Sequence, residues 1–312
     1  MNMDVDPIII VHGGAGWRRI EDESKQIILD HIKKAVDIGW KILLDGGSAV
    51  DAVTEAISYM EDSGYFNAGL GSCLNISGVR EMDAGIMDGY LYRAGAVASV
   101  KYPKNPIKLA RYIMENLDHI ILCCKEADRL AEKIGLSKIS NPPQRILDRY
   151  NKLIRDEDYL RRFPKNARIF NLFYNALDTV GAVALDSRGR ISAGSSTGGI
   201  WLKIPGRIGD SPIPGAGFYA DEYIGISSTG FGEHIIYSMP GVILREYIEL
   251  GYNVRKGLDR LFKFLKTRFG LDNMGLIGLT GDGEIIYKFD TVRMLVGYRT
   301  RDKSFINFVE RD

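Results

Sequence analysis

Apolar residues near the start of the chain change from a continuous run to a helical period. Residues 7–12 are nearly all apolar, as in a buried strand, and the glycine-rich stretch 13–16 after them is predicted to be a loop. Apolar side chains then recur every three or four positions across 28–43 and 50–57, which predicts two amphipathic helices. The second helix opens on Ser48-x-x-Asp51, a capping-box pattern.

The middle of the chain alternates between short strand and helix patterns. Residues 94–100 and 119–123 are β-prone, whereas 106–116 and 125–134 have helical spacing. The carboxylate-rich stretch 81–88 before them is assigned to capped turns. Helices packed on the face of a sheet fit this alternation, so the chain is expected to be α/β.

The pattern is interrupted from about residue 138 to 178. Asn-Pro-Pro opens this segment and charged residues with scattered aromatics follow, so we expect a poorly packed linker with one helix near 144–154. After Thr179 the character becomes β. Strands are expected at 180–185, 191–195, 223–228, 275–279 and 284–288, and helices at 240–250 and 254–267.

Composition and charge narrow the function without defining it. The 312 residues are 45% hydrophobic, which is ample for a buried core, and the formal net charge is +1. A net charge this small produces only a weak electrostatic field around the protein. It gives no reason to expect nucleic acid or an anionic membrane as partner, so a small-molecule or peptide substrate is the default. The acidic start and the short apolar run after it match neither a signal peptide nor a membrane span, and a cytoplasmic location is expected.

Residue types that commonly carry catalysis are few. The three cysteines include an adjacent pair and lack C-x-x-C spacing, so neither a disulfide framework nor a zinc knuckle is expected. No histidine lies beside a candidate nucleophile in a recognisable motif; the four are His12, His31, His119 and His234. A nucleophile in this chain therefore needs a base of another kind.

Asp178-Thr179-Val180-Gly181 places a threonine where an apolar strand begins after the polar segment. A threonine hydroxyl is a weak nucleophile, but a threonine at a chain terminus carries its own base, an α-amine of pKa roughly 7.7 to 8. That amine exists only after the bond between Asp178 and Thr179 is cleaved. The alternative is that Thr179 is simply a β-branched residue at the start of a strand.

Gly194-Ser195-Ser196-Thr197-Gly198-Gly199 is the first of three polar, glycine-rich segments downstream. Thr197 follows Thr179 by 18 residues, enough for a strand, a turn and a returning strand, so its hydroxyl is a candidate partner of the nucleophile. The same segment contains Gly194-x-Ser196-x-Gly198, the nucleophile elbow of serine hydrolases. That alternative requires a helix immediately afterwards, whereas 200–205 is extended in character.

The other two segments are 206–212 and 229–233. Arg207 and Asp210 in the first present a cation and an anion, which suit the carboxylate and the ammonium group of an amino acid. A surface ion pair is the alternative for these two residues. Thr229-Gly230 in the second segment follows a predicted strand, and taken alone it is most simply a β-turn.

Together these segments resemble the mature half of the asparaginase/isoaspartyl peptidase family of N-terminal-nucleophile hydrolases. Earlier segments resemble the family too, so the likeness covers most of the chain: 12–16, 47–53 and 67–69. The resemblance implies one domain over 1–312 with the four-layer αββα sandwich of that class. It also implies self-cleavage into an α chain, 1–178, and a β chain, 179–312, two of each forming a heterotetramer.

The resemblance assigns catalytic roles to individual residues. Thr179 is the expected nucleophile and Thr197 its hydrogen-bond partner. The Thr229 hydroxyl and the Gly230 amide are expected to form the oxyanion hole. Substrate binding is expected from Arg207, Asp210, Gly230 and Gly232, where the Gly232 carbonyl would help to hold the ammonium group.

The resemblance also implies supporting sites. Asn67, Gly13 and Asp178 are expected to assist processing at the cleavage site between Asp178 and Thr179. No cofactor is expected for catalysis, but a structural sodium ion is, unless the loop that would bind it is an ordinary tight loop. Its expected ligands are the backbone carbonyls of Met60, Glu61, Ser63, Phe66, Ala68 and Leu70.

The implied activity is hydrolysis of L-asparagine to L-aspartate and ammonia, and of β-aspartyl (isoaspartyl) dipeptides, which carry free α-amino and α-carboxyl groups. Trp201 and Leu202 stand where the family commonly has polar residues, and Phe231 occupies the variable position of Thr-Gly-x-Gly-Glu; both departures bear on substrate preference. Two alternatives stay open. One is a glycosylasparaginase-like hydrolase, suggested by Asp178, and the other is an unprocessed, inactive member that binds an amino acid.

Overall fold

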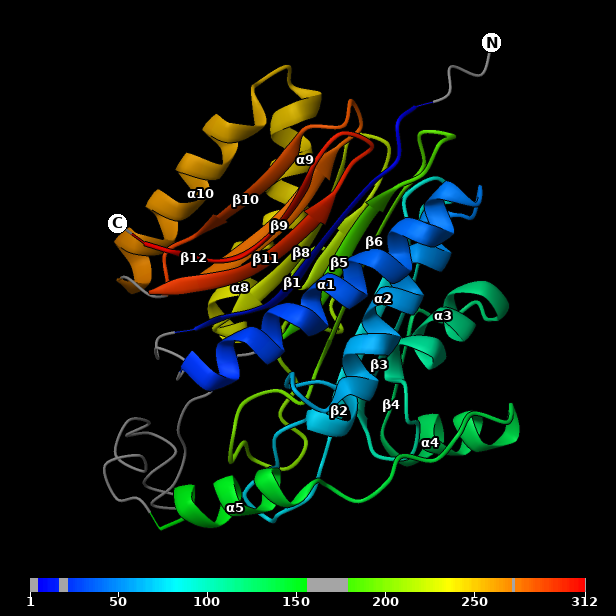
Figure 1. Ribbon diagram of the computed structural model, residues 1–312, viewed down its shortest axis with the longest axis vertical. Helices are drawn as coiled ribbons and strands as arrows, with labels where there is room; N and C mark the ends of the chain where they lie inside the picture. Colours follow the sequence, from blue (N-terminus) through cyan, green and yellow to red (C-terminus); the bar gives the residue numbers. More distant parts are fainter. Residues whose placement is uncertain (1–4, 17–21, 156–178, 271–272, 312) are drawn as a thin grey trace.

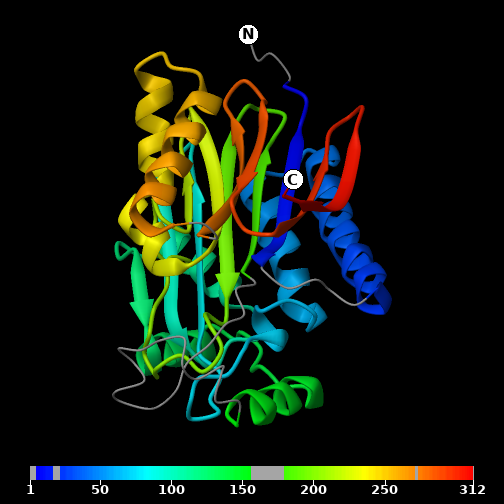
Figure 2. The ribbon, with the colours of Figure 1, turned by 90° about the vertical axis from the view of Figure 1, so that its left-hand side faces the viewer.

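The computed structural model describes residues 5–16, 22–155, 179–270 and 273–311, and these form four layers (Figures 1 and 2). Two β-sheets are stacked face to face, and helices cover the outer face of each sheet. In Figure 2 the layers run from the yellow and orange helices on the left to the blue helices on the right. The predicted α/β fold with αββα layers is confirmed.

The larger sheet contains eight strands: β1 (Ile8–Gly16), β2 (Met82–Asp88), β3 (Arg93–Val100), β4 (Ile121–Cys123), β5 (Val180–Leu185), β6 (Ile191–Thr197), β11 (Arg293–Arg299) and β12 (Ser304–Glu310). Their order is β12-β11-β1-β5-β6-β2-β3-β4, and neighbours are antiparallel except for β3 and β4. The strand that begins directly after Thr179, β5, therefore lies inside the sheet between β1 and β6.

The smaller sheet is antiparallel in the order β10-β9-β8-β7, with strands β7 (Phe218–Ala220), β8 (Ile224–Gly230), β9 (Met274–Thr280) and β10 (Ile285–Phe289). The helices are α1 (Asp22–Leu44), α2 (Ala49–Ser63), α3 (Pro106–Asn116), α4 (Cys124–Lys133), α5 (Gln144–Leu153), α8 (Gly232–Ser238), α9 (Pro240–Glu249) and α10 (Val254–Phe269). Helices α1, α2 and α3 pack on the larger sheet, while α9 and α10 pack on the smaller one. Among the described residues, no helix has the length and apolar character needed to cross a bilayer.

Alternate residues of the central strands contribute to two different cores. On β1, Ile9 and Val11 join the hydrophobic cluster under α1 and α2, while Ile8 and Ile10 join the cluster between the sheets. A strand presents successive side chains to opposite faces, and both faces of this sheet are covered. The apolar run at the start of the chain is therefore continuous because neither face of β1 meets water.

Two glycines allow the sheets to approach closely. A Cβ atom on Gly85 of β2 would lie 2.0 Å from Phe218 Cε1, and one on Gly225 of β8 would lie 2.5 Å from Ile191 Cγ2. Packed side chains do not come this near, so both positions require glycine for space. The close packing brings β8 against β5 and β6, where the candidate active site lies.

The glycine-rich stretch 13–16, predicted to be a loop, is the end of strand β1. The pairing of β1 with β11 shifts register between His12 and Ala15, and Gly14 has a φ of 107°. Only a residue without a Cβ adopts such an angle at little cost. The glycines thus allow an irregular strand, where the sequence alone indicated a loop.

The stretch 81–88, predicted to form capped turns, is mostly strand β2. Alternate residues from Met82 to Ile86 reach the core under the helices, and this burial favours a strand over a turn. Asp88 does cap a turn, because its side chain accepts hydrogen bonds from the amides of Tyr90 and Leu91. The assignment to capped turns was therefore wrong for the body of this stretch.

The helix predicted within the linker is α5, and it is packed against the body of the protein. Ile146 and Leu153 of α5 are buried with Trp201 and Leu202 in a third hydrophobic cluster. The prediction of a poorly packed linker is wrong for this part, and 156–178 lies outside the described residues. Trp201 and Leu202, which were expected to bear on substrate preference, pack against α5.

Candidate active site

Strand ends from both sheets meet around Thr179. The residue directly precedes β5, and the first pair of that strand, Val180 with Ser196, sets Thr179 beside the end of β6. On the other side of β5, His12 of β1 pairs with Gly181. Strand β8 of the smaller sheet faces these strands from across the interface between the sheets.

Thr179 is buried, with 6% of its surface exposed, and its hydroxyl donates a hydrogen bond to Thr197 Oγ1 at 3.3 Å. The Gly199 amide donates to the same oxygen at 3.0 Å, which fixes the Thr197 side chain. The structure thus brings together the two hydroxyls that the sequence paired. In this geometry Thr197 Oγ1 is an acceptor for the proton of the Thr179 hydroxyl.

His12 lies on the other side of Thr179. Its Nδ1 accepts from the Gly14 amide at 3.3 Å, and its Nε2 lies 3.1 Å from Ser227 Oγ. Complete burial lowers the pKa of His12 to about 3, against the opposing effect of its hydrogen bond with the Thr179 backbone. The ring is therefore neutral at pH 7 and holds the Thr179 backbone in place. Sequence reasoning missed this role, because only the pairing of β1 with β5 brings His12 to Thr179.

Gly181 accounts for the last position of the Asp-Thr-Val-Gly motif. A Cβ atom at this position would lie 2.0 Å from Ser227 Oγ and 2.4 Å from His12 Nε2. The space beside Gly181 is therefore filled by Ser227 and by His12, the residue that holds the Thr179 backbone. Glycine is required here by close packing, because the neighbouring side chains of Ser227 and His12 are both buried.

Thr229 and Gly230 form the end of β8, so the interpretation as an isolated β-turn does not hold. The Thr229 side chain is fully buried, and its hydroxyl oxygen accepts from the Ala15 amide at 3.4 Å. Gly230 has a φ of 144°, and a Cβ atom there would lie 2.5 Å from the Asn273 carbonyl oxygen. Because the Thr229 oxygen is an acceptor in this bond, its own proton is left to donate to another group.

Arg207 forms a two-point ion pair with Glu233. Its Nε donates to Oε1 at 3.1 Å and its Nη2 donates to Oε2 at 2.9 Å. Although burial opposes the charged form, the carboxylates of Glu233 and Asp210 raise the pKa of Arg207. Glu233 therefore orients the guanidinium group, a role that the sequence analysis did not assign.

Asp210 is brought beside Arg207 and Gly232, as the motif spacing implied. A Cβ atom on Gly232 would lie 2.9 Å from both Arg207 Nη2 and Asp210 Oδ1, so the three residues are in contact. Within the described part of the chain, the buried Asp210 Oδ2 has no hydrogen-bond partner. Burial raises the pKa of Asp210 to about 7, although the Arg207 charge lowers it. An open, buried carboxylate oxygen of this kind suits an ammonium group.

Asn67 braces the turn that follows Thr197. Its Nδ2 donates to the Gly199 carbonyl at 2.7 Å, and its backbone carbonyl accepts from the Gly198 amide at 2.9 Å. Its Oδ1 accepts from the Cys73 amide at 2.8 Å. Asn67 therefore acts on the turn that fixes Thr197, and it is connected to Thr179 through that turn.

The serine-hydrolase alternative for this segment is wrong. Ser196 lies on β6, and its hydroxyl donates to Glu61 Oε1 at 2.6 Å on the face of the sheet that carries α2. Residues 200–205 form turns and extended chain, without the helix that a nucleophile elbow requires. Ser196 is a buried structural hydroxyl.

The loop expected to bind sodium is closely packed. A Cβ atom on Gly69 would lie 2.5 Å from the Glu61 carbonyl oxygen, so glycine brings the backbone onto that oxygen. At the other end of the loop, Arg80 Nη2 donates to the Leu70 carbonyl at 3.2 Å and places a positive charge there. Carbonyl oxygens suit a hard cation, and the charge of Arg80 makes the Leu70 end of the loop the less favourable place for one.

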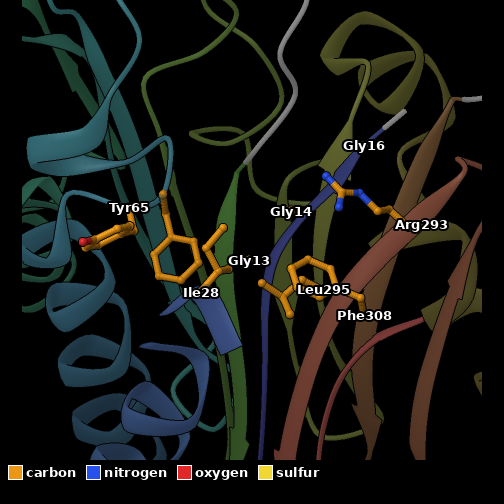
Figure 3. Close-up of a pocket in the computed structure, with 9 residues that line it drawn as sticks. Gly13, Gly14, Gly16, Ile28, Tyr65, Arg293, Leu295 and Phe308 are labelled. Carbon is orange, nitrogen blue, oxygen red and sulfur yellow. The ribbon is translucent and has the colours of Figure 1, made fainter. Parts of the chain in front are cut away.

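Gly13 lies on the helix-covered face of β1. A Cβ atom on Gly13 would lie 2.6 Å from Leu295 Cδ2 and 2.9 Å from Phe66 Cε1. A cavity of about 40 Å³ adjoins it, lined in part by Arg293 (Figure 3). This volume is on the scale of a single water molecule, so it is too small to hold an amino acid. Asp178, the other residue expected to assist processing, lies outside the described residues.

A buried ion pair beside the site was missing from the sequence analysis. Lys203 Nζ lies 3.7 Å from Asp83 Oδ2, and neither side chain is exposed. Asp83 pairs with Thr197 in the register of β2 with β6. The available signal was a lysine inside the mostly apolar segment 200–205, but its partner could be found only once 81–88 was known to be a strand.

Comparison with known proteins agrees with the motifs that contribute to this site. A family model described as asparaginase matches residues 5–307. The chain belongs to this asparaginase family. It is 41% identical over 291 residues to the plant-type L-asparaginase of Pyrobaculum calidifontis. The matched region covers 93% of this chain and 96% of the relative.

Mammalian members of the asparaginase family are equally similar. The chain is 40% identical over 283 residues to the isoaspartyl peptidase/L-asparaginase of Mus musculus, covering 90% of this chain and 85% of the relative. It is 41% identical over 280 residues to the protein of the same name from Homo sapiens, with 89% of each chain covered. The family resemblance inferred from the motifs is thus confirmed, while the roles of individual residues stay predictions.

We expect Gly181→Ala to destabilise the protein by about 1–3 kcal/mol, because the added methyl group overpacks the space beside His12 and Ser227. Thermal or urea denaturation measures this change. Adding Ser227→Ala removes the nearer of the two obstructing atoms and should recover part of the loss. A Gly181→Ala protein as stable as the wild type would contradict this account.

Proposed function

We propose that this chain is a self-processing threonine hydrolase that converts L-asparagine to L-aspartate and ammonia and cleaves β-aspartyl dipeptides. One observation carries the proposal: Thr179 donates its hydroxyl to Thr197 at the head of a buried strand, in a member of the asparaginase family. The names of the relatives, plant-type L-asparaginase and isoaspartyl peptidase/L-asparaginase, support both substrate classes.

Cleavage between Asp178 and Thr179 is the first step of the proposal. The Thr179 oxygen attacks the Asp178 carbonyl carbon, the peptide C–N bond breaks as its nitrogen takes up a proton, and an ester remains. Water hydrolyses the ester to the Asp178 carboxylate and the Thr179 hydroxyl. The products are an α chain, 1–178, and a β chain, 179–312, whose first residue carries both a nucleophile and an α-amine base.

Hydrolysis of the substrate then follows the same chemistry. The α-amine takes the proton of the Thr179 hydroxyl while the oxygen attacks the side-chain carbonyl of the substrate. The Thr229 hydroxyl and the Gly230 amide stabilise the oxyanion that forms. The C–N bond breaks, the amine of the leaving group takes the proton, and water hydrolyses the remaining ester to release L-aspartate.

Recognition in this proposal depends on the free ends of the substrate. Arg207, oriented by Glu233, binds the α-carboxylate, and Asp210 with the Gly232 carbonyl binds the α-ammonium group. The open oxygen of Asp210 supports this assignment. A heterotetramer of two α and two β chains and a cytoplasmic location remain predictions from the sequence and its resemblance.

We expect Thr179→Ala to remain a single chain of 34.8 kDa and to release no ammonia from L-asparagine, because it lacks both the attacking oxygen of the processing step and the nucleophile of turnover. The wild type should show two bands of about 20 and about 15 kDa on denaturing electrophoresis, from the mean residue mass of the chain. Thr179→Ser keeps a hydroxyl and is the matched control. It should still be cleaved.

The same assay separates the alternatives. A wild-type protein that stays uncut after long incubation at neutral pH would point to the amino-acid-binding protein. For cleaved protein, turnover of L-asparagine, β-aspartyl-leucine and a glycosylated asparagine should be compared. Turnover of the glycosylated substrate alone would favour the glycosylasparaginase-like hydrolase.

We expect the KM for L-asparagine to rise as the pH falls below about 7. The raised pKa of Asp210 means that its carboxylate is increasingly protonated there, and a neutral carboxyl group does not attract the substrate's ammonium group. In the limit, KM rises about tenfold for each pH unit. The ammonium group of a bound substrate keeps Asp210 ionised, so kcat should not follow the titration of Asp210. This separates the titration of Asp210 from protonation of the Thr179 amine, which would lower kcat. A KM that is constant from pH 8 to pH 5.5 would rule out this role of Asp210.

We also propose that the loop 60–70 binds a sodium ion through backbone carbonyls. Backbone carbonyl oxygens gather in this loop, since a Cβ atom on Gly71 would lie 2.1 Å from the Phe66 oxygen and 2.4 Å from the Gly64 oxygen, and this supports the proposal. Binding to the native state stabilises a protein, so the thermal midpoint should be higher in sodium chloride than in choline chloride of equal ionic strength. Equal midpoints in the two salts would speak for an ordinary tight loop.

A further inference from the structure

Lys203 is a fully buried lysine beside the candidate active site. Its Nζ donates to the Glu81 carbonyl oxygen at 3.0 Å and lies 3.7 Å from Asp83 Oδ2. A buried ammonium group loses the solvation of its charge, so it needs an anion and hydrogen-bond acceptors nearby. Both are supplied here by the start of β2.

Asp83 connects this ammonium group to the strand that carries Thr197. Asp83 pairs with Thr197 across β2 and β6, and its Oδ1 accepts from the Ser99 amide at 2.7 Å. Its Oδ2 is buried and, among the described residues, has no hydrogen-bond partner. Lys203 is the cation that faces this oxygen, so the ion pair lies one strand away from the partner of the nucleophile.

Lys203 also contacts the turn that follows Thr197. A Cβ atom on Gly199 would lie 3.0 Å from Lys203 Nζ and 2.9 Å from its Cδ, so the lysine packs directly on this glycine. The Gly199 amide in turn donates to Thr197 Oγ1. Lys203 therefore supports the residue that fixes the Thr197 hydroxyl.

Glu81 holds the far end of the same segment. Its Oε2 accepts from the Gly206 amide at 3.0 Å, directly before Arg207, while its carbonyl oxygen accepts from Lys203. The segment between Gly199 and Gly206 is thus attached to the residue directly before β2 at two points, Lys203 in its middle and Gly206 at its end. One end of it leads from the nucleophile's partner, and the other leads to the residues of the amino-acid pocket.

We propose that Lys203 and Asp83 are positioning residues, which hold Thr197 and the Arg207–Asp210 loop at a fixed separation. This inference rests on the proposed function, because the separation matters only if Thr179 and the pocket act on one substrate. Replacing a buried ion pair by uncharged groups of similar volume is often neutral for stability, so the pair is not required for folding as such. Its contribution is geometric, and a displacement of about 1 Å at a reacting group can cost about 100-fold in rate.

The test compares Lys203→Met, Asp83→Asn and the double variant, with methionine replacing lysine by an uncharged side chain of similar length. Each single variant leaves one buried charge unpaired and should lower the thermal midpoint, and the double variant should recover most of that loss. Although its thermal midpoint is recovered, we expect the double variant to show a higher KM for L-asparagine and a lower kcat, by about tenfold or more. A double variant with wild-type KM and kcat would overturn the proposal.

Two further variants keep the test decisive. Lys108→Met removes an exposed ion pair with Glu55 and should leave both KM and kcat unchanged.

Glu81→Gln preserves side-chain shape and leaves the Lys203–Asp83 pair intact, but weakens the hydrogen bond to Gly206. It should raise KM with little change in kcat, and an unchanged KM would overturn the proposed link even if the double variant does not fold. Wild-type protein that is neither cleaved nor active would contradict the proposed function instead, whereas defects confined to the variants concern the ion pair.

Discussion

The pairing of β5 with β1 and β6 is the constraint on which the site depends. All six residues of β5 are buried, so its backbone groups have no water to replace the hydrogen bonds of the two neighbouring strands. The same pairing sets Gly181 against His12 and places Thr179 beside Thr197. The position of the threonine hydroxyl is therefore determined by the backbone of three strands, and the side chains around it complete the arrangement.

A second constraint is the balance of charge around Lys203 and Arg207. Asp83, Asp210 and Glu233 face the cations of Lys203 and Arg207, which leaves one excess negative charge in this group. Burial is the main reason for the raised pKa of Asp210, and the charges of Glu233 and Asp83 add to it. An empty pocket can relieve the excess by holding a proton on Asp210. An ammonium group does the same when a substrate is bound, so the pocket and the zwitterion are matched in charge as well as in shape.

Local patterns in the sequence predicted most of the fold, but not the contacts between distant strands. The capping box predicted at Ser48 is present, with the Ser48 hydroxyl accepting from the Asp51 amide. It could be predicted because both of its members lie within one helical turn. The roles of His12 and Lys203 could not be predicted from local patterns. They depend on the pairing of β1 with β5 and of β2 with β6, and no local spacing encodes that pairing. The edge strand β12 was missed for a different reason: most of its residues are partly or fully exposed, so it lacks the apolar run or strict alternation by which buried strands are recognised.

The strand order has a consequence for the protein after processing. In the larger sheet, strands from before residue 178 and strands from after it alternate in blocks: β12 and β11, then β1, then β5 and β6, then β2, β3 and β4. A cut before Thr179 would therefore leave two polypeptides interleaved in a single sheet and joined along three strand boundaries. Neither could leave without opening the core on both faces of that sheet. The two fragments would unfold and refold as one cooperative body, and the cut would change the chemistry at Thr179 without creating two separable proteins.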